Sequence, residues 1–389
     1  MKWTSNEDFF LGMMDVRKQS LADMYEAYSK YKIDYIGYSN ELQQYFLYST
    51  SDDPGIYSIV SHIGYWLNAK DIFPVYQGFM FFSIFLATCA ALFGLNKIFQ
   101  SRSGNNGFKW MSIFIVSLLG LFVCIKSDVY AFYFVGLCMV PLLYYSFTTT
   151  DSPQYSLILA SLFIMNIAEY CRSQSGLIAM LFLFLGVLIL SKYRAAKKAL
   201  IVALLVLSFY AFKKYVKYKS QVAIEWLTVH EKKFDINENT HHPYWHSIYI
   251  GLGFVKNKYG IEYRDSVAID EVAKVNKTCL YGSDEYESII RNKYMGLLKD
   301  DPMFFIQSYG AKGGIILAMV LFLTFPVWWY RIFVWRETAV FGITASYASL
   351  SALLVYPRIN YLMPVIVLCI FFSVIMIPAF SNAKTKEYK

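Results

Sequence analysis

The sequence predicts an all-α protein that crosses a membrane many times, and three observations support this prediction. The chain of 389 residues is 57% hydrophobic and only 16% charged, whereas soluble domains carry about 25% charged residues. Aromatic residues make up 19% of the chain, and Tyr and Trp favour the two membrane–water interfaces. Apolar runs of helical length follow one another from residue 74, interrupted by one long polar stretch at 213–310. We therefore expect a polytopic membrane protein of about nine transmembrane helices with two hydrophilic loop modules.

Residues 1–73 form the first hydrophilic module. The segment from Thr4 to Asp8 has the pattern of a helix cap with acidic residues in the first turn, and an amphipathic run follows to about Tyr31. Ser51-Asp52-Asp53-Pro54-Gly55 is a turn signal that contains two adjacent carboxylates. The run from Ile56 to Leu67 is apolar enough to form a helix that lies in the membrane interface.

The rest of the chain divides around the long polar stretch. Residues 74–212 are expected to form a six-helix bundle, and residues 311–389 three further helices and a basic tail. The expected spans are 74–96, 110–126, 129–147, 155–170, 177–191, 199–212, 311–330, 338–356 and 361–380. Residues 213–310 form the second module, which opens with a lysine cluster and ends in an acidic, aromatic tract, Tyr281–Asp301, that predicts a helix.

Lysine and arginine residues in the short loops predict the orientation of these helices. The loops 97–109 and 192–198, the segment between the seventh and eighth runs, and the C-terminal tail are all basic, and they share one side if the helices alternate. Short basic loops face the cytoplasm, so we expect both modules on the extracytoplasmic side. This topology explains much of the formal charge of +8. The sequence has no basic face interleaved with stacking aromatics, so we expect no nucleic-acid partner.

Nine alternating helices with a cytoplasmic C-terminus place residues 1–73 outside, although no apolar segment precedes them in the sequence. Two interpretations reconcile these observations. In the first, a tenth helix precedes the present Met1. In the second, the N-terminus is cytosolic and one helix within 110–147 is miscounted. We favour the missing first helix.

Two short motifs accompany this plan. One runs from Asp52-Asp53-Pro54-Gly55-Ile56-Tyr57 through to Leu67, and the other, Tyr356-Pro357-Arg358-Ile359-Asn360-Tyr361-Leu362-Met363-Pro364, heads the last apolar run. With a first helix restored, the plan resembles the GT-C superfamily of membrane glycosyltransferases, such as protein O-mannosyltransferases and the aminoarabinose transferase acting on lipid A. The two motifs are similar to the proline-containing motif of the family's first loop and to its Arg–Tyr–Leu–Pro signature.

The resemblance implies an enzyme that takes a sugar from a polyprenyl-phosphate carrier and transfers it to a glycan, lipid or protein acceptor. It implies a multi-pass protein of the bacterial inner (plasma) membrane, with membrane lipids as partners and an active site that faces the periplasm or the exterior. The acceptor hydroxyl needs a carboxylate base within hydrogen-bond reach. The departing phosphate needs cationic groups, best supplied by arginine, and the lipid tail needs an apolar groove.

The candidate bases are three aspartates, of which Asp53 ranks first, and Asp52 and Asp8 are the others. In the catalytic interpretation of the adjacent pair, one carboxylate is the base and its neighbour raises its proton affinity by repulsion. The alternative is a solvated turn before a proline. Asp8 occupies the place where the family's principal acid falls, although it fits a helix cap better.

The candidate ligands of the carrier phosphate are Arg358, Arg172 and Tyr361. Arg358 and Tyr361 belong to the motif that heads the last span. Arg172 lies between two apolar runs, where ionisable residues are costly and tend to be functional. The alternative for Arg172 is an arginine that pairs with Glu169 or extends to the lipid headgroups.

His242 and His246 lie four positions apart, the spacing that places two histidines on one face of a helix. Pro243 disfavours such a helix and no cysteine or carboxylate lies at ligand spacing beside them, so we expect no metal and no cofactor besides the lipid-linked donor. Contact with the carrier phosphate or the acceptor is the functional interpretation of both histidines. A structural role is the simpler interpretation.

Two other functions are alternatives. An O-antigen polymerase or ligase also acts on a carrier lipid and has a large outer loop with Arg and His, but it would tolerate the loss of Asp53 and Asp8. A transporter would need ionisable residues in mid-span or paired broken helices. The sequence shows neither feature clearly.

Overall fold

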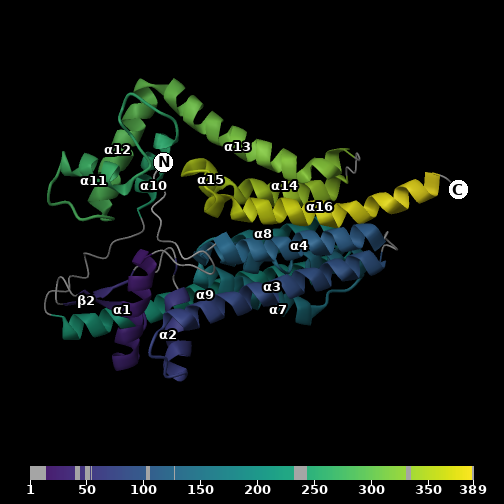
Figure 1. Ribbon diagram of the computed structural model, residues 1–389, viewed down its shortest axis with the longest axis horizontal. Helices are drawn as coiled ribbons and strands as arrows, with labels where there is room; N and C mark the ends of the chain where they lie inside the picture. Colours follow the sequence, from purple (N-terminus) through teal and green to yellow (C-terminus); the bar gives the residue numbers. More distant parts are fainter. Residues whose placement is uncertain are drawn as a thin grey trace.

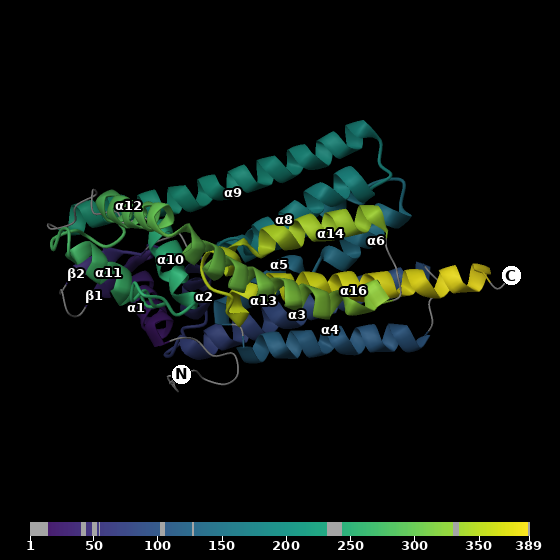
Figure 2. The same cartoon turned by 90° about the horizontal axis from the view of Figure 1, so that it is seen from above.

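The computed structural model describes residues 15–39, 44–48, 53, 55–101, 106–126, 128–231, 243–329 and 334–387. Most of the described chain is helical, and its one sheet is a two-stranded hairpin. The long helices run side by side along an elongated molecule (Figure 1). The described parts of both hydrophilic modules lie at the same end of these helices, as Figures 1 and 2 show.

The N-terminal module consists of α1 (Asp15–Tyr31), β1 (Ile36–Ser39), β2 (Gln44–Leu47) and α2 (Ile56–Trp66). The two strands are antiparallel, with Ile36 opposite Leu47. α1 packs against both α2 and β1. The helix predicted from residue 56 is confirmed, whereas the hairpin, formed by a Tyr-rich tract, was not predicted.

The membrane bundle follows. It consists of α3 (Phe73–Ser101), α4 (Asn106–Lys126), η1 (Asp128–Ala131), α5 (Phe132–Leu137), α6 (Val140–Thr149), α7 (Tyr155–Cys171), α8 (Ser175–Leu185), η2 (Gly186–Leu190) and α9 (Ala195–His230). The η1–α5–α6 segment is its centre, because 89% of its apolar window is buried. α5 packs against α7, α8 and α16 (Ile359–Glu387), and α6 packs against α3.

α9 is a single helix of 36 residues at one edge of the bundle (Figure 2). The sequence suggested a span that ends at residue 212 and a loop that begins with the lysine cluster. The helix instead continues through this cluster to His230, because no Gly or Pro interrupts residues 195–230 and lysine is a good helix former. The predicted boundary between 212 and 213 therefore falls inside a helix.

The second module contains α10 (Tyr244–Gly251), η4 (Leu252–Phe254), α11 (Asp265–Ala273) and α12 (Asp284–Asp300). α12 confirms the helix predicted from the acidic, aromatic tract. α13 (Pro302–Trp329) begins nine residues before the expected span, because proline fits the first helical position and Asp301 Oδ1 accepts the backbone N–H of Phe304 at 3.2 Å. The predicted boundary between 310 and 311 thus also falls inside a helix.

α14 (Trp335–Ala348), α15 (Leu350–Leu354) and α16 complete the chain. Within the described ranges, six helical segments are long and apolar enough to cross a membrane: α3, α4, η1–α6, α9, α13 and α16. α7 and α8–η2 are shorter apolar helices, and α14 and α15 are separated at Ser349. The nine predicted apolar runs all lie on helical segments, and the architecture is that of an all-α membrane protein.

Candidate functional site

Four charged side chains form one buried cluster where the N-terminal module meets the bundle. Asp53 accepts hydrogen bonds from Arg17 Nε at 3.1 Å and from Arg172 at 2.8 Å. Asp128 accepts a hydrogen bond from the other end of the Arg17 guanidinium and one from the Tyr76 hydroxyl at 3.1 Å. The four charged side chains are only 6–14% exposed. Their formal charges cancel, as the burial of charged groups requires.

Four different segments supply these side chains. Arg17 lies in the first described turn of α1, and Asp53 in the loop before α2. Arg172 caps the C-terminus of α7. Asp128 begins η1 with a φ of 38°, a left-handed conformation that Asp tolerates better than most residues. Such backbone strain is concentrated at functional sites.

Gly55 allows the Asp53 loop to lie against α7. A Cβ atom on Gly55 would lie 2.2 Å from ring atoms of Tyr170, two residues before Arg172. The Tyr170 hydroxyl forms a hydrogen bond of 2.6 Å with the hydroxyl of Tyr35, which precedes β1. This close approach of backbone to ring brings Asp53 within reach of Arg172.

Tyrosines surround the cluster. The guanidinium of Arg172 lies 4.5 Å from the ring centroid of Tyr130, and that of Arg17 lies 5.5 Å from the same ring. Burial raises the pKa of Tyr57, so this phenol stays protonated. Burial alone would lower the pKa of Arg17, but Asp128 and Asp53 outweigh it and raise that pKa.

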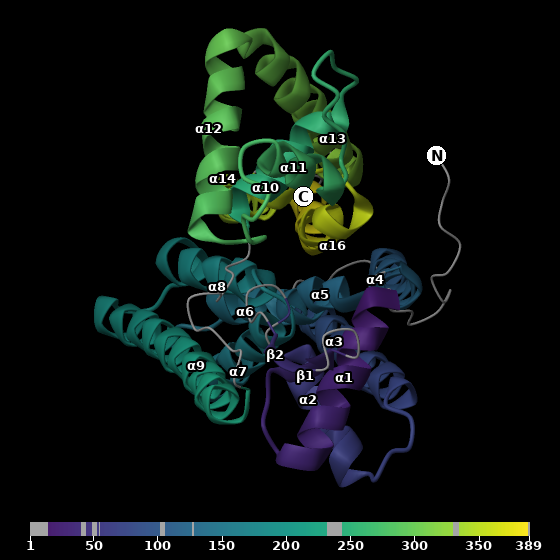
Figure 3. The ribbon, with the colours of Figure 1, turned by 90° about the vertical axis from the view of Figure 1, so that its left-hand side faces the viewer.

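A row of aromatic contacts connects the cluster with Arg358. The ring centroids of Tyr130 and Tyr361 are 5.7 Å apart, and the Tyr361 side chain interacts electrostatically with that of Tyr263. The Tyr263 ring in turn lies 4.5 Å from the Arg358 guanidinium. Figure 3 looks onto this end of the molecule, with α1 and α2 on one side and α10–α12 on the other. The structure thus connects Asp53, Arg172, Tyr361 and Arg358, all of them predicted site residues, through shared neighbours.

Arg358 differs from Arg172 in its surroundings. It is exposed, and its guanidinium lies on the rings of Tyr263 and Tyr356, at 4.5 and 5.2 Å. Within the described parts of the chain, no carboxylate forms an ion pair with it. The N–H groups of Arg358 are therefore open to an anion from solvent.

His246 lies in the core of the second module. Its ring is 2% exposed, with Nδ1 at 2.6 Å from the Tyr286 hydroxyl and Nε2 at 3.1 Å from Asp265. The hydrogen bond with His246 lowers the pKa of Asp265. Because both ring nitrogens are engaged inside this module, the arrangement is that of a structural histidine.

Three predicted site residues, Asp8, Asp52 and His242, lie outside the described residues. The residues that the structure does describe include no group of three His, Cys, Asp or Glu side chains that could hold a metal ion.

The structure adds site residues that we did not predict, chiefly Arg17 and Tyr263. It also contains a separate buried carboxylate, Asp34. This residue accepts hydrogen bonds from Ser58 at 2.7 Å and from Lys219 at 2.8 Å, and lies 2.8 Å from His62 Nε2. Burial alone would raise the pKa of Asp34, but the hydrogen bonds with His62, Lys219 and Ser58 lower it to about 2.

An apolar groove of about 630 Å³ lies between α7 and α9. It is lined by Leu162 and Ile167 from α7 and by Leu204 and Leu207 from α9. Tyr170, the ring on which Gly55 lies, also lines it. The groove therefore reaches the immediate neighbourhood of the charged cluster.

Comparisons with protein-family models, with curated proteins and with solved structures found no match to this chain.

Proposed function

We propose that this chain is an integral membrane glycosyltransferase. It moves a sugar from a polyprenyl-phosphate-linked donor to a glycan, lipid or protein acceptor on the extracytoplasmic face. The observation that supports this proposal best is that Asp53 accepts one hydrogen bond from Arg17 and another from Arg172 in one buried cluster. A carboxylate and several guanidinium groups at one place are what sugar transfer from a phosphate carrier needs.

The reaction has a defined balance of atoms. The acceptor hydroxyl gives its proton to Asp53, and its oxygen forms a bond to the anomeric carbon of the donor sugar. The bond from that carbon to the phosphate oxygen breaks, and polyprenyl phosphate leaves with the electron pair. A carboxylate offers about four lone-pair sites, so the two hydrogen bonds to Asp53 leave room for the acceptor.

The arginines stabilise the phosphate as it departs. A guanidinium group can bind a phosphate through two parallel N–H···O hydrogen bonds. Fixed donors directed at the oxygen where negative charge develops stabilise the transition state strongly in a buried site. Arg172 is the inner ligand because it already contacts Asp53. Arg358 is the outer ligand because it is exposed and carries no ion pair with a described carboxylate. Tyr361 lies between them in the aromatic row.

The carrier tail occupies the groove between α7 and α9, which reaches the cluster at Tyr170.

In the membrane, the nine apolar helical runs act as spans, and the shorter ones lie tilted or begin within the interface. Both modules then face the outside of the bacterial plasma membrane. Their common position at one end of the helices supports this arrangement (Figure 1).

Reconstitution in liposomes tests the proposal. The purified chain is supplied with a polyprenyl-phosphate sugar, and release of polyprenyl phosphate coupled to acceptor glycosylation is measured. Movement of intact lipid between leaflets without sugar release would identify a transporter instead. Sugar transfer that Asp53→Asn leaves intact while Arg172→Gln and Arg358→Gln abolish it would favour the polymerase or ligase alternative.

A further inference from the structure

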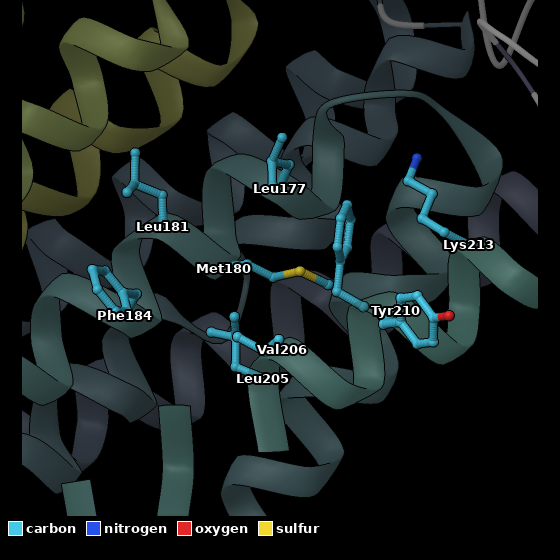
Figure 4. A pocket seen from close by; sticks show the side chains of 9 residues that line it. Leu177, Met180, Leu181, Phe184, Leu205, Val206, Tyr210 and Lys213 are labelled. Carbon is cyan, nitrogen blue, oxygen red and sulfur yellow. The ribbon is translucent and has the colours of Figure 1, made fainter. Parts of the chain in front are cut away.

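A second apolar groove lies between α8 and α9, and the proposed reaction does not use it. Its volume is about 420 Å³. Figure 4 shows the row of side chains that line it, with Phe184 towards one end and Lys213 at the other. Among the described residues that line this groove, Lys213 alone carries a charge.

Along α9, the residues that flank the groove change from apolar to aromatic to basic, in the same order as the layers of a membrane from hydrocarbon to headgroups. Val206, Tyr210, Lys213 and Lys217 are spaced by four, three and four residues, so they lie on one face of the helix. Apolar side chains belong in the hydrocarbon, Tyr at the interface and Lys at the headgroups. This order predicts that the Lys213 end of the groove lies at the level of the headgroups.

The ammonium of Lys213 remains available to a headgroup. Its side chain is 51% exposed, and its contact with Glu169 is long, at 3.4 Å. The other carboxylate oxygen of Glu169 accepts the backbone N–H of Leu177 at 3.1 Å. That N–H belongs to the first turn of α8, where the helix dipole stabilises negative charge. Because the first turn of α8 already stabilises Glu169, this carboxylate does not occupy all three N–H donors of Lys213. The remaining donors of the exposed ammonium face solvent.

We propose that this groove binds one acyl chain of an anionic phospholipid whose phosphate lies against Lys213. Charge complementarity selects the anionic headgroup. From Val206 to Lys213 the helix rises about 10 Å, which is about a third of a hydrocarbon core of about 30 Å. The groove therefore holds the part of the acyl chain that lies next to the headgroup. The site does not depend on sugar transfer.

Native mass spectrometry of the full chain in detergent tests this site. The probes are phosphatidylglycerol and phosphatidylcholine with identical acyl chains, and the readout is the apparent affinity of each lipid. We expect preference for phosphatidylglycerol and a loss of about fivefold in Lys213→Gln, the size of one lysine–headgroup attraction. Val206→Phe, which fills the groove, should displace the lipid, whereas Lys213→Arg should retain it.

Two neighbouring positions provide matched controls. Lys214 is exposed on the same helix but does not line the groove between α8 and α9. Leu207 lines the other groove, the one between α7 and α9. Lys214→Gln and Leu207→Phe should therefore bind phosphatidylglycerol as the unmodified chain does. Val206→Phe leaves the contact between Lys213 and Glu169 in place, so its effect does not depend on that ion pair.

Three results would overturn the proposal. Equal affinity for the two phospholipids would show that the site does not recognise the charge of the headgroup. Equal losses in the groove variants and their controls would show adsorption to the general surface. Retention of polyprenyl phosphate but not of phosphatidylglycerol would assign the groove to the carrier instead.

Discussion

Nε of Arg17 lies 3.1 Å from Oδ2 of Asp53, and the same guanidinium binds Asp128, which is 111 residues away from Arg17 in the chain. One side chain on α1 therefore fixes both the loop before α2 and the start of η1.

Arg17→Gln should destabilise the protein by about 3 kcal/mol, because it leaves the buried carboxylate of Asp128 without the cation that binds it. Asp53→Asn should also destabilise it, and the double variant should lose about 2 kcal/mol less than the sum of the two. SDS titration in mixed micelles measures the unfolding free energies. Arg264→Gln is the control, because the pair of Arg264 with Glu262 is more than half exposed and worth less than about 1 kcal/mol. Additive effects of Arg17 and Asp53 would contradict the bridge.

Gly55→Ala should disturb the site through Tyr170. A Cβ atom 2.2 Å from the ring requires the loop or the ring to move, at a cost of about 1–3 kcal/mol. Thermal unfolding in detergent measures this effect. Gly78→Ala in α3 is the control, because nothing lies within 4 Å of its new Cβ and alanine favours a helix by about 1 kcal/mol. Equal stability of the two variants would show that Gly55 is not closely packed.

Asp34 should make stability depend on acid pH. Its folded pKa of about 2 lies below the unfolded value of about 3.9, so its contribution to the free energy of unfolding, about 2.6 kcal/mol, is complete above that unfolded value. The contribution is lost as the pH falls through 4 towards 2. The difference in unfolding free energy between the unmodified chain and Asp34→Asn, measured from pH 7 to pH 2, should shrink over this interval. A difference that stays constant would contradict the lowered pKa.

Arg358→Lys should weaken donor binding more than catalysis. Lysine keeps the charge but loses the planar, paired N–H groups and the stacking on Tyr263. We expect KM for the lipid-linked donor to rise about tenfold, about 1.4 kcal/mol of binding, with kcat little changed. Arg264→Lys, another exposed arginine, is the control and should leave KM unchanged. A fall in kcat at constant KM would place Arg358 at the reacting bond.

The sequence predicted the helices well because long apolar runs leave few alternatives. It failed at the ends of α9 and α13, where polar residues continue a helix. Lys213–Lys219 read as the start of a loop, yet lysine and tyrosine are compatible with helix and no Gly or Pro stops it. Tertiary contacts of this segment, such as the ion pair of Lys219 with Asp34, also stabilise the helix beyond the apolar run, and the sequence does not show these contacts.

Part of the candidate site could be predicted and part could not. Asp53 and Arg172 stood out because a carboxylate beside a proline turn and an arginine between apolar runs are unusual. Arg17 did not, since it lies on an amphipathic helix where a cation normally faces solvent. Tyr263 is one of 33 tyrosines in the chain, and only the folded contacts distinguish it. Sequence patterns identify residue types suited to the chemistry, whereas tertiary packing decides which of them meet.

The most direct test of sugar transfer by this cluster is the single-turnover rate of Asp53→Asn in liposomes at saturating lipid-linked donor. Asp151→Asn, an exposed carboxylate outside the cluster, is the control, and rates are normalised to folded protein. We expect the Asp53 variant to be at least about 100-fold slower, with the donor still bound and the Asp151 variant unchanged. An Asp53→Asn variant that transfers sugar at the unmodified rate would contradict the assignment of Asp53 as the base.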